Sequence, residues 1–278
     1  MSKPFSILNR HSDLIRGDIH LPADFNGAPV VIICHGFKGF KDWGGFPHAA
    51  EYFASKGFAA IRFNFSLNGV EDDFMEFTAL ERFSRNTISR ELDDLRDLVD
   101  AIAAGDILPE ECDKTRIALV GHSLGGGVVI VHASEDDRIG AVASWAGVAD
   151  FRRWGKKTCA LWRKTGRLEI QNARTGQMMP VDVSMLEDIE SNTERFNILS
   201  AAARMKQPLL ILHGEQDVSV ALAEGESIAA AAGPSHSALT SIPNTDHTFG
   251  VRHPFEGATP EFTTVLEKTV ESFRSAFD

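Results

Sequence analysis

One serine has the sequence setting of a nucleophile. Ser123 is the centre of Gly121-His-Ser-Leu-Gly125, which follows a run of apolar β-forming residues and precedes a stretch of helical pattern. This order predicts a strand, a sharp turn and a helix, with the serine hydroxyl exposed at the apex of the turn. Gly121 and Gly125 suit the close passage of strand and helix beside the turn. A hydroxyl held in this way can attack a carbonyl carbon and form a covalent intermediate.

A serine hydroxyl is a weak nucleophile at neutral pH, so it needs a general base and a third group that orients the base. His247 lies on a loop before the last predicted helix, and Asp217 lies on a loop after an apolar run. Glu215 is a second candidate for the acid, and His253 is a second candidate for the base. The chain order Ser123, Asp217, His247 is the order expected when such a serine follows a strand of a parallel sheet.

Attack on a carbonyl group creates an oxyanion, which backbone N–H groups can stabilise. The N–H of Leu124, directly after the serine, is one expected donor. The loop after the apolar run 30–34 is the expected source of the second donor.

The glycines at 125–127 do not form a phosphate-binding loop, because the Lys-Ser/Thr pair of that motif is absent.

Apolar runs of strand length alternate with stretches of helical period along the chain. Strands buried on both faces of a parallel sheet are predicted at 30–34, 58–65, 117–120, 139–145 and 208–212. An opening antiparallel pair is predicted at 5–10 and 14–21, a last strand at 239–242, and helices over 87–104 and after the capping pair Thr259-Pro260. We therefore expect an α/β fold with a mostly parallel, doubly wound sheet of eight strands.

The segment 150–203 interrupts this alternation. It is rich in charged residues, and its stretch 168–182 predicts two short strands around the turn Arg174-Thr-Gly176. We therefore predict a small cap at 150–203, inserted into a core that consists of residues 1–149 and 204–278.

The insertion falls over the edge of the sheet at which Ser123 is expected. Four apolar side chains of the insertion are candidates for the lining of a substrate pocket: Trp154, Trp162, Met178 and Met179. Ligand pockets are mostly apolar, which suits these residue types. A structural core for the cap itself is an equally ordinary use of the two tryptophans.

Three motifs together resemble those of the α/β-hydrolases. They are His35-Gly-Phe-Lys-Gly39, Gly121-His-Ser-Leu-Gly125, and His213-Gly-Glu-Gln-Asp217 with Asp246-His247. The chain is most similar to the dienelactone hydrolase-like and cinnamoyl esterase-like esterases of that superfamily. The resemblance implies a triad of Ser123, Asp217 and His247, because its pattern has the acid four residues after the strand-end histidine. It also implies Phe37 as the second oxyanion donor.

The resemblance further implies a cofactor-independent hydrolase that cleaves carboxylic esters through an acyl-enzyme on Ser123. Cinnamoyl esterases commonly bind the phenolic hydroxyl group of their substrates with a lid tyrosine, whereas the only tyrosine of this chain, Tyr52, lies outside the insertion. We therefore expect esters with short acyl or aryl groups. A peptidase or an acyltransferase with the same triad, and a binding protein with a vestigial triad, are the alternatives, because the superfamily hosts many chemistries.

Composition restricts the partners and the location. A net charge of −11 argues against a general nucleic-acid binder, whose surface must be basic. No apolar run reaches about 18 residues, and the first ten residues lack the pattern of a signal peptide, so we expect neither a membrane span nor export. The wide spacing of Cys34, Cys112 and Cys159 predicts no disulfide framework and no metal site, which suits the cytoplasm. The expected partner is a small-molecule ester substrate, and a homodimer is compatible with the sequence.

Overall fold

A computed structural model describes residues 2–71, 76–172 and 175–278. These ranges contain an eight-stranded sheet with the strand order β1-β2-β4-β3-β5-β6-β9-β10. Its strands are β1 (Ser2–Leu8), β2 (Leu14–His20), β3 (Pro29–Cys34), β4 (Ala59–Asn64), β5 (Asp113–His122), β6 (Ile139–Trp145), β9 (Leu209–Gly214) and β10 (Ser237–Ile242). β2 pairs antiparallel with β1 and with β4, and the other neighbours run parallel. The predicted mostly parallel sheet of eight strands is therefore confirmed.

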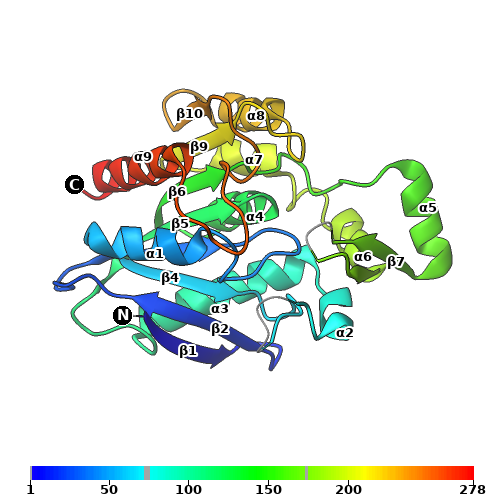
Figure 1. Cartoon of the computed structure of the whole chain (residues 1–278), viewed down its shortest axis with the longest axis horizontal. Helices are drawn as coiled ribbons and strands as arrows, with labels where there is room; N and C mark the ends of the chain where they lie inside the picture. Colours follow the sequence, from blue (N-terminus) through cyan, green and yellow to red (C-terminus); the bar gives the residue numbers. More distant parts are fainter. Residues whose placement is uncertain (1, 72–75, 173–174) are drawn as a thin grey trace.

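The central strands are buried on both faces because their side chains are almost all apolar. Every residue of β4 and β9 is buried, as is every residue of β3 after Pro29. Helices α1 (Phe46–Ser55) and α9 (Pro260–Phe277) pack beside each other on one face of the sheet (Figure 1). On the other face, α3 (Ile88–Ala104), α4 (Leu124–Ala133), α7 (Ile198–Arg204) and α8 (Leu222–Ala232) follow one another side by side. Among the helices of the described ranges, none has the length and apolar character that crossing a bilayer requires.

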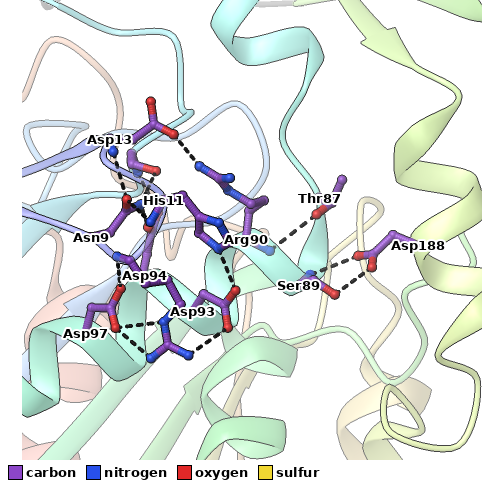
Figure 2. A network of polar contacts seen from close by, with 12 residues as sticks. Asn9, His11, Asp13, Thr87, Ser89, Arg90, Asp93, Asp94, Asp97 and Asp188 are labelled. Carbon is purple, nitrogen blue, oxygen red and sulfur yellow. Dashed lines mark hydrogen bonds and ion pairs between the residues drawn. The ribbon is translucent and has the colours of Figure 1, made fainter.

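Polar contacts hold the turn between β1 and β2 against α3 (Figure 2). Asn9 Nδ2 donates to Oδ1 of the buried Asp94 over 2.6 Å, and His11 Nε2 lies 2.7 Å from Asp93 Oδ2. The N-terminus of α3 is capped by Thr87, whose Oγ1 accepts the N–H of Arg90 at 3.3 Å. These contacts fix the edge of the sheet to a helix that packs beside α4.

The segment between β6 and β9 carries its own small sheet. Within it, α5 (Lys156–Thr165) precedes β7 (Arg167–Gln171), which pairs antiparallel with β8 (Met178–Asp182), and α6 (Ser184–Ser191) follows. Of the predicted turn at 174–176, Arg174 lies outside the described residues. Figure 1 shows α5, α6 and β7 together at one side of the molecule, whereas α7 packs against α4 and α8.

Hydrogen bonds attach this insertion to the segment around α2 (Leu80–Ser84) and α3. The Asp188 carboxylate accepts the N–H of Ser89 at 2.9 Å and its hydroxyl at 2.6 Å (Figure 2). Ser84 Oγ donates to Asp182 Oδ2 over 2.9 Å. Since Ser89 lies in the first turn of α3, the Asp188 charge also suits the positive end of that helix.

Candidate active site

Ser123 lies on the turn between β5 and α4, with φ 59° and ψ −120°. A positive φ is strained for a residue with a side chain, and such strain is concentrated at functional sites. The turn fits only because glycines flank it. A Cβ atom at Gly121 would lie 2.2 Å from the Gly125 carbonyl oxygen, and one at Gly125 would lie 2.5 Å from the His35 carbonyl oxygen. The backbone therefore holds the serine at the N-terminus of α4.

The structure joins His247 to Asp217. His247 Nδ1 lies 2.7 Å from Asp217 Oδ2, and the carboxylate is completely buried. Burial opposes ionisation of Asp217, but hydrogen bonds from His213, His247 and the N–H of Val220 outweigh it and hold its pKa below the ordinary value. Asp217 is thus a buried carboxylate that orients an imidazole.

The alternative candidates point elsewhere. Glu215 Oε1 accepts the hydroxyl of Ser241 at 3.0 Å, on the exposed side of the loop. His253 Nδ1 accepts the N–H of Gly44 at 3.0 Å. Both side chains thus have contacts away from the bond between His247 and Asp217.

The loop after β3 passes directly beside the serine. A Cβ atom at Gly36 would lie 2.9 Å from Ser123 Cβ and 3.3 Å from the Leu124 nitrogen, so only glycine fits there. Leu124 is the first residue of α4, and N–H groups in the first turn of a helix have no partner within it. Phe37, the next residue of the loop, lines the same cavities as Ser123. Leu124, directly after the serine, and Phe37, in the lining of both cavities, are thus near enough to Ser123 to remain the expected oxyanion donors.

Two cavities meet at Ser123. The first, which we name the histidine cavity, has a volume of about 250 Å³ and is lined by Trp43, Phe46, His122, Asn172, His247 and Thr248, among others. The second, which we name the apolar cavity, has a volume of about 350 Å³ and is lined mainly by apolar side chains, including Ile88, Val148, Phe151, Trp154, Met185 and Ile189. Ser123 lines both cavities, whereas His247 lines the first and not the second.

The sequence profile of the Dienelactone hydrolase family matches residues 15–277. The chain belongs to the dienelactone hydrolase family. The expected resemblance is therefore confirmed, and membership indicates a hydrolase.

Two solved structures have a similar fold, and one further protein is similar in sequence over part of its length. The structure of DcsB with its substrate analogue matches with a TM-score of 0.79 at 16% identity, over 99% of this chain and 100% of that one. Est1E from Butyrivibrio proteoclasticus, with ferulic acid bound, matches with a TM-score of 0.70 at 20% identity, over 100% of this chain and 99% of that one. An uncharacterized 31.7 kDa protein from the traX-finO intergenic region of Escherichia coli is 32% identical over 123 residues. That match spans 44% of this chain and 38% of the relative.

The four apolar residues expected to line a substrate pocket have different environments in this dienelactone hydrolase family member. Trp154 lines the apolar cavity. Trp162 and Met179 are completely buried, and the Trp162 indole N–H donates to the Val181 carbonyl at 2.9 Å, so Trp162 packs inside the insertion. Met178 is 49% exposed. None of these three contributes to the lining of the apolar cavity.

Helix α6 belongs to the site although no sequence motif indicated it. Met185 and Ile189 of α6 line the apolar cavity, and Leu186 between them is also buried. Their spacing of four residues is the signal of an apolar helix face and could have indicated them.

No group of three or more side chains suited to holding a metal ion exists among residues 2–71, 76–172 and 175–278.

His122 supports the site from the position before the nucleophile. Its Nε2 lies 2.9 Å from the carbonyl oxygen of His247, which can only accept, so this nitrogen donates. The His122 ring is also stacked against Trp43, with 6.3 Å between centroids and 10° between planes. The backbone of His247 is thereby fixed beside Ser123.

Proposed function

We propose that this protein is a serine hydrolase that cleaves carboxylic esters through an acyl-enzyme on Ser123. The observation that carries the proposal is the 2.7 Å contact between His247 and a buried Asp217, at a cavity that His247 shares with a strained Ser123. A base oriented by a buried carboxylate is the arrangement that activates a serine hydroxyl.

Each group has a role in the proposed reaction. His247 takes the proton from Ser123 Oγ as the oxygen attacks the ester carbonyl, and Asp217 stabilises the resulting imidazolium. The N–H groups of Leu124 and Phe37 hold the oxyanion. His247 then gives its proton to the leaving alcohol, and water releases the acid with His247 again as the base.

The two cavities suggest which part of the ester lies where. The leaving alcohol must depart on the side of Ser123 where His247 can protonate it, which is the histidine cavity. The apolar cavity does not include His247 in its lining, and its side chains suit a hydrocarbon chain or ring. We therefore assign the acyl group to the apolar cavity and a smaller alcohol to the histidine cavity.

Hydrolysis of 4-nitrophenyl butyrate tests the proposal. We expect turnover by the unsubstituted protein and a loss on the order of 10⁶ in kcat for Ser123→Ala, which leaves only background. Ser219→Ala is the matched control, because Ser219 lines both cavities and takes no part in the proposed chemistry. Equal activity of Ser123→Ala and the unsubstituted protein would refute the proposal.

A further inference from the structure

A second histidine contacts the acid of the proposed triad from the protein interior. His213 is the fifth residue of β9, and its side chain is completely buried. Its Nε2 lies 3.4 Å from Asp217 Oδ2, the oxygen that His247 Nδ1 contacts at 2.7 Å. Asp217 thus lies between two imidazoles, and only His247 lines the cavity at Ser123.

The hydrogen bonds of His213 define where its proton is. Nε2 lies 2.9 Å from the Val220 carbonyl oxygen, which can only accept, so Nε2 carries a hydrogen. Nδ1 has no hydrogen-bond partner among the described residues and is buried, so a proton there would have no acceptor. The Nε2–H therefore faces both the Val220 carbonyl and the Asp217 carboxylate.

Asp217 is the centre of a tight turn that His213 closes. Asp217 Oδ1 accepts the N–H groups of Ser219 and Val220 at 2.8 and 2.9 Å, so the turn wraps around its own carboxylate. The bond from His213 to the Val220 carbonyl then fastens the end of this turn to the end of β9. Any rotation of the carboxylate away from His247 would have to break these contacts.

Helix α8 blocks movement of the His213 ring from behind. A Cβ atom at Gly225 would lie 2.9 Å from His213 Nδ1 and 3.3 Å from Ile211 Cγ2. The helix backbone thus approaches the imidazole so closely that only glycine fits between them. The ring has the turn at Asp217 in front of it and α8 behind it.

We propose that His213 is a positioning residue, which holds Asp217 and its turn in the place that His247 needs. The inference rests on the proposed function, since it gives a role to a neighbour of the triad. His213 acts through Asp217 and does not touch the substrate. Its essential property is one N–H donor at the position of Nε2.

Two substitutions at His213 separate this role from packing. His213→Gln keeps a buried N–H donor at the end of a side chain of similar reach, whereas His213→Met fills the space without a donor. We expect kcat for 4-nitrophenyl butyrate to fall about 10- to 100-fold in His213→Met with little change in KM, because a displaced triad slows the chemical step. His213→Gln should retain most of the kcat of the unsubstituted protein.

A third variant moves the ring without replacing it. Gly225→Ala should push His213 toward Asp217 and lower kcat by about tenfold, although alanine is the better residue in a helix. Ser227→Ala, on the exposed face of the same helix, is the matched control and should keep its activity.

The outcomes separate this inference from the proposed function. If the unsubstituted protein hydrolyses no ester, the proposed function fails. If the unsubstituted protein is active, the two variants at His213 decide the inference. The inference is wrong, and His213 only packs, if His213→Met and His213→Gln both keep their kcat. It is also wrong if both lose kcat equally, with the same drop in melting temperature. Loss of kcat in the Met variant with recovery in the Gln variant supports it.

Discussion

For single residues, the direction of the side chain decides the role, as Asp217 and Glu215 show. Both are carboxylates on the loop after β9, and their residue types alone leave either as the acid. In the structure Asp217 is buried against His247, while Glu215 is exposed and accepts from Ser241. The family pattern favours Asp217. The contact between Asp217 and His213 depends on the packing of α8, which the sequence alone does not show.

We predict that Asp217→Asn loses far more activity than Glu215→Gln. An amide at 217 favours the wrong tautomer of His247, which costs up to about 10⁴ in kcat in the best-studied triad. Glu215→Gln should change kcat/KM little, since its partner is the surface Ser241. Steady-state kinetics on one ester with both variants is the measurement, and equal losses would show that the acid has been misassigned.

A second buried acid affects stability. Burial raises the pKa of Glu91 from 4.5 to about 8, although Asn86 Nδ2 donates to its Oε1 at 2.7 Å. Between these two values the unfolded chain releases the Glu91 proton while the folded protein keeps it, so Glu91 lowers the free energy of unfolding as the pH rises. Above about pH 8 this loss is complete.

We therefore predict that Glu91→Gln stabilises the protein more at pH 8 than at pH 5. The amide can accept from Asn86 and carries no charge to bury. Melting temperatures of the variant and the unsubstituted protein at both pH values measure the effect, with the exposed Glu226→Gln as control. An increment that is the same at the two pH values would contradict the assignment.

At the scale of the element, α6 links the insertion to the site. Its residues Met185 and Ile189 face the apolar cavity, and its Asp188 is bound to Ser89 at the start of α3 (Figure 2). The sequence predicted a cap over 150–203, and this domain division stays a prediction. Trp154 faces the apolar cavity, whereas Trp162 packs against β8. The sequence could not distinguish them, because both are tryptophans in the same stretch of mostly polar residues.

We predict that Met185→Trp selectively impairs esters with a bulky acyl group, because the larger side chain occupies the apolar cavity. Two isomeric esters provide the test, methyl 4-phenylbutanoate with a large acyl group and 3-phenylpropyl acetate with a large alcohol. The unsubstituted protein should prefer the first, and Met185→Trp should lower its kcat/KM about tenfold while leaving the acetate nearly unchanged.

Met178→Trp is the matched control for this comparison, since Met178 is 49% exposed. It should leave the preference between the isomers unchanged. A preference for 3-phenylpropyl acetate, or an equal effect of the two tryptophan substitutions, would mean that the acyl group binds elsewhere.

At the scale of the whole molecule, the strand pattern predicted most of the fold. Continuous apolar runs identified the central strands, because strands covered by helices on both faces need apolar side chains throughout. Edge strands are less constrained by burial, and β1 accordingly spans Ser2–Leu8 where the pattern indicated 5–10. The strand order and the two cavities arise from contacts between distant segments, such as the loop after β3 beside Ser123, which no local pattern contains.

The central claim is that Ser123 is the nucleophile, and a fluorophosphonate probe tests it most directly. The reagent forms a stable adduct with an activated serine, which intact-mass measurement and sequencing of the labelled peptide can locate. We predict one adduct per chain, on the peptide that contains Ser123, and none in Ser123→Ala. An adduct on Ser219, which lines the same cavities, or no adduct on the unsubstituted protein would contradict it.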